Sequence, residues 1–161
     1  MSRSTRDKVH FTPHVIDIWT IFLGYKIYNT KKIKMTKSTI NQVMTTQEVA
    51  SRFNQLAKQE KWFEIQDELF SDVVRSIDPP DSPYFGYAEG KTPVRKKGEE
   101  FVNKIEAVHR RYTTEPVVAD NHFAVGREVD ITVQGFGRIQ INEVMLYEVK
   151  DGQIVSEQFF Y

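Results

Sequence analysis

Two charged residues interrupt the apolar faces of two predicted strands. Every second residue of 123–133 is apolar except Arg127, and every second residue of 139–149 is apolar except Glu143. Alternate side chains of a strand share one face, so both charges point to the apolar side. A buried charge is costly without a partner, so we predict that Arg127 and Glu143 approach each other and line a pocket. A hairpin around Gly135–Gly137 pairs 127 with 143 in one register.

The chemistry that this pair could perform has two interpretations. In the first, Arg127 anchors an anionic or carbonyl oxygen, while Glu143 orients Arg127 or acts as a general base. In the second, the two residues form a structural ion pair or lie at the wet rim of the sheet. The strand pattern supports both interpretations. A catalytic carboxylate would need a raised pKa in a dry pocket.

Asp78 is a second candidate for a catalytic carboxylate. It follows a short predicted strand, Val73–Ile77, and precedes Pro79. A carboxylate at the end of a strand could transfer a proton. Asp-Pro also initiates turns, so the same dipeptide has a purely structural interpretation.

Four further residues are candidate ligand contacts. His122 begins a predicted strand and faces either solvent or the mouth of the pocket. Tyr84 and Tyr87 lie in a Pro-flanked loop that either covers the pocket or packs onto the domain. Tyr147 shares the inward face of Glu143. The candidate catalytic residues are therefore Asp78 and Glu143, and the candidate ligand-binding residues are Arg127, His122, Tyr84, Tyr87 and Tyr147.

The sequence indicates chemistry without a metal or a cofactor. It has no cysteine, and we predict no metal site from its four histidines. Neither a phosphate-binding glycine loop, a serine nucleophile motif nor a dinucleotide fingerprint is present.

The elements around these residues predict helices packed on one side of an antiparallel sheet, an α+β arrangement. Thr45 and Glu48 form a capping box at the start of the first helix. Residues 62–70 form a second helix. A third helix follows Gly98-Glu99-Glu100, with Phe101, Ile105 and Val108 as its apolar stripe. The period then changes to two, which predicts strands at 115–132 (with a break near 120–121), 138–150 and 153–161.

Charge divides the chain into two parts. Residues 1–44 carry eight Lys or Arg and two Asp, a net charge of +6, and residues 45–161 carry 14 basic and 20 acidic residues, a net charge of −6. The acidic domain is therefore not expected to bind nucleic acid. Val15–Tyr28 is apolar, but it is shorter than a membrane span and contains two charges. We expect 1–44 to be a poorly ordered appendage of a cytoplasmic protein without a membrane anchor, and Met35 or Met44 to be alternative translation starts.

Three segments carry a family resemblance: VVRSIDPP, GKTPVRKKGEEFVNKI and NEVMLYEVKDGQIVSEQFFY. They resemble the SnoaL-like branch of the NTF2-like superfamily, and the resemblance covers residues 45–161. It implies an α+β cone in which a strongly curved antiparallel sheet and about three helices enclose a pocket. It also implies a homodimer packed through the sheet. One fold hosts many functions, so the resemblance assigns no reaction.

Two functions are consistent with the resemblance. One is a non-catalytic, dimeric module that binds a small apolar or carbonyl-bearing ligand. The alternative is a cofactor-free isomerase, cyclase or hydratase that acts on a small apolar carbonyl compound. Asp78-Pro79 resembles the catalytic Asp-Pro of ketosteroid isomerase, a member of the superfamily. The positions matching that enzyme's oxyanion donors are Phe53 and Met145, which cannot donate, so its reaction is not expected here.

Overall fold

A computed structural model describes residues 43–161. The predictions for the appendage and for a start at Met35 fall on residues outside this range. In chain order the described elements are helices α2 (Thr46–Ala57) and α3 (Trp62–Leu69), strands β1 (Phe70–Ile77) and β2 (Ala88–Glu89), helix α4 (Lys91–Val102), and strands β3 (Ile105–Thr113), β4 (Val117–Ala119), β5 (His122–Val133), β6 (Gly137–Lys150) and β7 (Gln153–Phe160).

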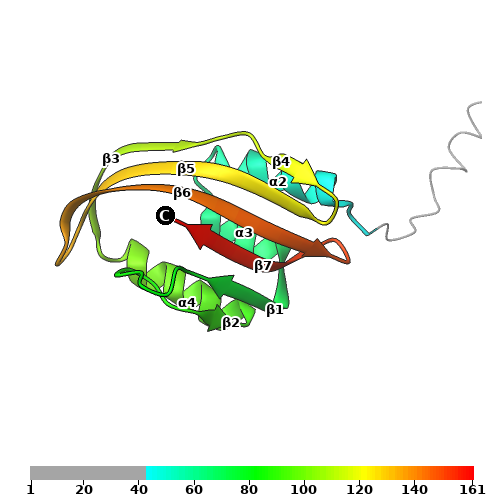
Figure 1. Ribbon diagram of the computed structural model, residues 1–161, viewed down its shortest axis with the longest axis horizontal. Coiled ribbons are helices and arrows are strands. Elements are labelled where there is room, and N and C mark those ends of the chain that lie inside the picture. Colours follow the sequence, from blue (N-terminus) through cyan, green and yellow to red (C-terminus); the bar gives the residue numbers. More distant parts are fainter. Residues whose placement is uncertain (1–42) are drawn as a thin grey trace, which may run out of the picture. The chain divides into compact units, whose positions relative to one another are not determined.

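The strands form one curved sheet with open edges (Figure 1). Their order is β2-β1-β7-β6-β5-β3, and β4 pairs with the same edge of β5 as β3. β1 runs parallel to β7, whereas the other pairs are antiparallel. The predicted α+β cone is confirmed, but the sheet is mixed rather than wholly antiparallel. The reason is that α4 and β3 to β6 separate β1 from β7 in the chain, so no hairpin joins them.

Helix α2 begins where the capping box predicts. The Glu48 amide donates to Thr45 Oγ1 at 3.3 Å, and the Thr45 amide donates to Glu48 Oε2 at 2.8 Å. These bonds satisfy backbone donors that the first turn of a helix leaves unpaired. The apolar face of α2 buries Phe53, whose ring lies 5.2 Å from Phe123 and 4.7 Å from Tyr147. This aromatic cluster fixes α2 against the inner face of β5 and β6.

The β5–β6 hairpin has the register that the sequence predicts. Arg127 lies opposite Glu143, and Val133 lies opposite Gly137. Gly135 and Gly137 adopt φ values of 84° and 76°, which glycine tolerates far better than residues with a Cβ. The turn therefore places both predicted charges on the inner face of the sheet.

The third predicted helix is wrong in its extent. Helix α4 starts at Lys91 and ends at Val102, and Ile105–Thr113 form strand β3. Phe101, Ile105 and Val108 have helical spacing, but a register shift between Val108 and Arg110 hides the two-residue alternation of the strand. Pairing along the edge of β5 therefore outweighs the local helical pattern.

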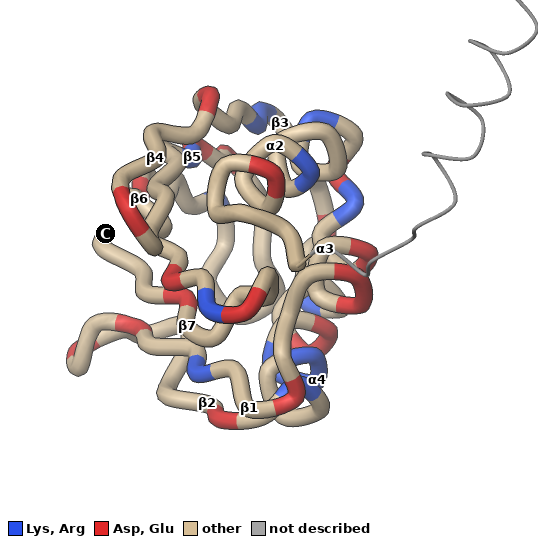
Figure 2. The backbone as a smooth tube through the Cα atoms, turned by 90° about the vertical axis from the view of Figure 1, so that its right-hand side faces the viewer, with Lys and Arg blue, Asp and Glu red and all other residues tan. Residues whose placement is uncertain are grey.

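Helix α4 is tied to α3 mainly through Arg95. Its guanidinium donates to the Phe63 carbonyl at 2.8 Å and to Asp67 at 3.0 Å, and it lies 4.3 Å from the centre of the Phe63 ring. Helix α3 carries only acidic charges, whereas α4 carries charges of both signs (Figure 2). The Arg95 contacts hold α3 and α4 together as one wall of the space between the helices and the sheet.

Candidate functional site

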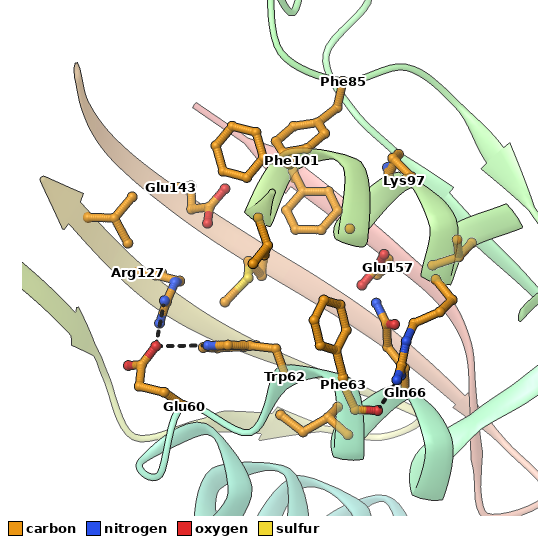
Figure 3. A pocket seen from close by; sticks show the side chains of 18 of the residues that line it. Glu60, Trp62, Phe63, Gln66, Phe85, Lys97, Phe101, Arg127, Glu143 and Glu157 are labelled. Carbon is orange, nitrogen blue, oxygen red and sulfur yellow. Dashed lines mark hydrogen bonds and ion pairs between the residues drawn. The ribbon is translucent and has the colours of Figure 1, made fainter. Parts of the chain in front are cut away.

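A pocket of about 780 Å³ lies between the inner face of the sheet and helices α3 and α4 (Figure 3). Its volume is in the range of ordinary small-molecule sites. Its wall is mostly apolar and aromatic, with side chains that include Trp62, Phe63, Phe85, Phe101, Met145 and Phe159. The pocket therefore offers an apolar surface to a small molecule and a few polar groups at defined positions.

Glu143 is a partly buried carboxyl in the wall of this pocket. Among residues 43–161 no side chain or backbone group forms a hydrogen bond with it, and its carboxyl points into the pocket (Figure 3). Burial raises the pKa of Glu143 to about 7. The positive charge of Arg127 opposes this rise, whereas the negative charges of Asp78 and Glu157 add to it. The result is a carboxyl that exchanges its proton near neutral pH and is free to contact a ligand.

Arg127 lines the same pocket, but its carboxylate partner is Glu60 rather than Glu143. Its Nη2 donates to Glu60 Oε2 at 2.9 Å, and its Nη1 donates to Thr113 Oγ1 at 2.8 Å. The guanidinium lies 4.1 Å from the centre of the Trp62 ring, and Trp62 itself donates to Glu60 at 2.9 Å. Arg127 is thus held in one orientation with part of its hydrogen-bonding capacity unused.

The contacts of Glu60 decide its ionisation state. Burial alone would raise the pKa of Glu60, but hydrogen bonds from Arg127 and Trp62 outweigh burial and leave this pKa below its ordinary value. Glu60 therefore stays ionised and neutralises Arg127. Because Arg127 forms its ion pair with Glu60, Glu143 has no ion-pair partner among residues 43–161.

Replacing Glu60 by Gln is expected to redirect Arg127 toward Glu143. The free energy of unfolding should fall by about 1–3 kcal/mol, because a largely buried guanidinium loses its carboxylate. The pKa of Glu143 should fall as well, since Arg127 then interacts with it more strongly. Denaturant unfolding and an NMR titration of the Glu143 carboxyl measure the two effects. Glu106→Gln, an exposed change on β3 outside the pocket lining, is the control and should alter neither quantity.

A second polar cluster lies at the end of the pocket formed by β1, α4 and β7. The Lys97 ammonium donates to Asp78 at 2.5 Å, to Ser76 Oγ at 2.6 Å and to the Gly86 carbonyl at 3.3 Å. The Tyr161 hydroxyl donates to Asp78 at 3.2 Å. Asp78, whose side chain is 1% exposed, is therefore neutralised by Lys97.

Glu157 is the second buried carboxyl of this cluster, and the residue is 6% exposed. It accepts a hydrogen bond from the Ser76 hydroxyl at 2.6 Å. Burial raises the pKa of Glu157 to about 7, although the bond from Ser76 and the charge of Lys97 act in the opposite direction. The pocket thus contains two carboxyls, Glu143 and Glu157, that are partly protonated at neutral pH.

The structure brings four of the seven predicted site residues together. Asp78, Arg127, Glu143 and Tyr147 line the pocket. The hydroxyl of Tyr147 is directed at the sulfur of Met145, 3.4 Å away, and burial raises the pKa of Tyr147 well above its ordinary value. Tyr147 therefore serves the pocket as an apolar wall rather than as a proton donor.

The other three predicted residues lie outside the pocket lining. His122 is paired with Ala119 and Glu148 at the start of β5. Tyr87 is 61% exposed and donates to Glu89. The Tyr84 ring lies 5.3 Å from Phe136 at the tip of the β5–β6 hairpin. It is the neighbouring Phe85 that lines the pocket, because the two side chains of this loop point in different directions.

Several polar pocket residues were missed by the sequence prediction. Lys97 lies three residues after Val94 and four before Phe101, so a lone charge on a helical apolar stripe could have identified it. Glu157 alternates with Phe159 and Tyr161, the same pattern that identified Glu143. Glu60 lies in the turn between α2 and α3, where no period exists to reveal it.

Two features are absent from residues 43–161. These residues contain no group of three His, Asp or Glu side chains placed to hold a metal ion. Within the same range, none of the helices combines the length and the hydropathy that crossing a membrane requires.

Comparison with known proteins places residues 44–161 in a family. Residues 44–161 match the SnoaL-like domain. A candidate SnoaL-like polyketide cyclase from Mesorhizobium loti, also described as a carbohydrate phosphatase, is 31% identical with a TM-score of 0.69, covering 73% of this chain and all of the other. Two more solved structures have a similar fold. An NTF2-like protein from Burkholderia thailandensis is 9% identical with a TM-score of 0.62, and a candidate isomerase from Rhodopseudomonas palustris is 15% identical with a TM-score of 0.51. Each match covers 73% of this chain and 90% of the other. The search of curated proteins gave no match. The family match over residues 44–161 shows that this chain belongs to the SnoaL-like family.

Proposed function

We propose that the protein is a cofactor-free acid–base enzyme that moves a proton at the carbon next to the carbonyl of a small, mostly apolar compound. One observation carries the proposal: Glu143 lies in an apolar pocket without a hydrogen-bond partner among residues 43–161, and its pKa is raised to about 7. A general base works best when its pKa is close to the working pH. Glu143 meets this requirement beside a fixed guanidinium.

The reaction begins with the ionised form of Glu143. Its carboxylate takes a proton from the carbon next to the substrate carbonyl, and the electrons of the broken C–H bond move onto the carbonyl oxygen. Arg127 has five N–H donors and spends one on Thr113 and one on Glu60, so donors remain for this oxygen. A fixed donor that faces developing negative charge lowers the barrier.

The enolate then has two outcomes that leave the enzyme unchanged. If the substrate has a carbon–carbon double bond next to the deprotonated carbon, the enolate extends to a dienolate, and return of the proton from Glu143 to its far carbon isomerises the substrate by moving the double bond. Attack of the enolate carbon on a second carbonyl of the same molecule forms a ring, and Glu143 protonates the new alkoxide. Two of the structurally similar proteins are described as a candidate cyclase and a candidate isomerase, which is consistent with either outcome.

The second candidate function is a non-catalytic ligand-binding module. The ion pair between Arg127 and Glu60 favours this function, because a guanidinium whose charge is neutralised stabilises the negative charge on a substrate oxygen less strongly. The two candidates differ in what they require of Glu143. Catalysis needs its proton, whereas binding needs only the apolar walls.

Hydrogen–deuterium exchange tests the proposed enzyme directly. A panel of cyclic ketones and diketones, among them 2-tetralone, is incubated in D₂O with the wild type and with Glu143→Gln, and exchange at the carbon next to the carbonyl is followed by NMR. We expect exchange above the buffer rate with the wild type and none with Glu143→Gln. Ketones that bind both proteins without exchange above the buffer rate would support the ligand-binding module instead.

We also propose that two copies of the chain pair through the outer face of the sheet. Val144 and Phe160 lie opposite each other on β6 and β7 and are 48% and 49% exposed. Val144→Asp should convert a dimer into a monomer in sedimentation velocity, because a carboxylate would be buried in the interface. Ser51→Asp, on an exposed residue of helix α2 on the other side of the sheet, is the control and should remain dimeric. A wild-type monomer at high concentration would contradict the proposal.

A further inference from the structure

Two polar groups of the pocket keep unused hydrogen-bonding capacity at the end remote from Arg127. Glu157 Oε1 accepts from Ser76, but Oε2 has no partner among residues 43–161. The side-chain oxygen of Gln66 on α3 is buried and also has no partner in that range. Both residues line the pocket, and Figure 3 draws the Gln66 amide directed toward the carboxyl of Glu157. An unpaired polar atom that is buried carries a cost, so a ligand that pairs with it gains affinity.

The charges around these two groups select the kind of ligand. Lys97 spends its three N–H donors on Ser76, Asp78 and Gly86, so none is left for an anion. The positive charge of Lys97 also repels a cationic group of a ligand. A neutral group is therefore favoured. Protonated Glu157 donates one hydrogen bond, and the Gln66 oxygen accepts one, which matches a hydroxyl group that accepts and donates at once.

Gly98 on α4 lies beside the Gln66 amide. A Cβ at this position would lie 3.4 Å from Phe63 Cε1 and 3.7 Å from Gln66 Nε2, which are ordinary contact distances. Helix α4 thus passes close to the amide without filling the pocket in front of it.

We propose that Glu157 and Gln66 form a second polar subsite, which binds a hydroxyl group at the end of the substrate remote from Arg127. The inference rests on the proposed function only in taking the same pocket as the substrate site. It deepens that function by naming the substrate class: compact apolar ketones that carry a hydroxyl group at the far end.

The sheet register sets the size of such a substrate. Arg127 lies opposite Glu143, and Glu157 lies opposite Tyr147, four residues further along β6. This separation corresponds to about 13 Å between backbone positions along the strand. The side chains reach inward from both ends and shorten the gap. Two fused six-membered rings with polar groups at opposite ends have a suitable length, and the pocket of about 780 Å³ has room for them.

Calorimetric titration of two ketones tests the subsite without requiring turnover. 6-Hydroxy-2-tetralone carries the hydroxyl group opposite its carbonyl, and 2-tetralone lacks it. At pH 6.5 we expect the wild type to bind the hydroxylated compound about tenfold more tightly, the usual effect of one satisfied hydrogen bond. In Gln66→Leu the two dissociation constants should become equal. Gln59→Leu, an exposed change on the turn after α2, should keep the preference.

The subsite is overturned by equal dissociation constants in the wild type, by failure of both ketones to bind, or by a preference that persists in Gln66→Leu. These results differ from a failure of the proposed function. A hydroxyl preference without any Glu143-dependent proton exchange would support the subsite and contradict the proposed proton transfer. Glu143-dependent exchange without a hydroxyl preference would support the proton transfer and contradict the subsite.

Discussion

Glu143→Gln is expected to reduce kcat for proton exchange by about a thousandfold, the usual contribution of a positioned acid–base group. The amide has the size of the carboxyl but cannot accept the proton. Because Glu143 has no hydrogen-bond partner among residues 43–161, its replacement breaks no contact there, and KM should change little. Steady-state exchange rates of the two proteins on the same ketone measure the effect.

The pH dependence provides a second readout of the same group. The active form of Glu143 is the carboxylate, so kcat/KM of the wild type should rise with pH and level off above the pKa of about 7. Glu128→Gln serves as the control, because Glu128 is an acid on the neighbouring strand that pairs with Arg110 at the surface. A Glu143→Gln enzyme with near wild-type kcat would show that another group moves the proton.

The stability of the protein is expected to fall as the pH rises from 5 to 8. Glu143 and Glu157 have pKa values of about 7 in the folded protein and an ordinary value of 4.5 when unfolded. Between these values the folded state binds more protons than the unfolded state, so the free energy of unfolding decreases with increasing pH. Each group contributes a loss of about 3 kcal/mol that is complete above pH 7.

Chemical denaturation at several pH values measures this loss. The double variant Glu143→Gln/Glu157→Gln should be nearly insensitive to pH over the same range, and it should exceed the wild type in stability at pH 8. Asp130 does not disturb the comparison, because its hydrogen bond from Arg138 lowers its pKa to about 2, and its contribution is lost only below about pH 4. Parallel profiles for the wild type and the double variant would exclude buried, protonated carboxyls.

The sequence predicted those site residues that lie on regular strands, where alternate side chains point to the same face. Arg127 and Glu143 were found because strands alternate, and their register followed from the turn at Gly135–Gly137. The same argument applied to β7 and to α4 would have found Glu157 and Lys97. Inward-facing charges on regular elements are therefore accessible to sequence reasoning.

The partner of Arg127 could not be found in this way. Glu60 reaches the guanidinium from an irregular turn, and the helical packing that brings it there depends on contacts distant in sequence, such as that of Phe53 with Phe123. Strand β3 was misassigned for a related reason, since its edge position leaves most of its residues exposed and removes the apolar alternation. Tertiary contacts decide such segments, and local patterns do not record them.

An NMR titration of the Glu143 side-chain carboxyl carbon measures directly whether Glu143 exchanges its proton near neutral pH. The signal is assigned by its disappearance in Glu143→Gln and followed between pH 4 and 9. We expect a midpoint near 7, well above the ordinary 4.5, because the carboxyl is held in an apolar pocket. A midpoint near 4.5 would show a solvated carboxylate or one paired with Arg127, and would contradict the proposed proton transfer.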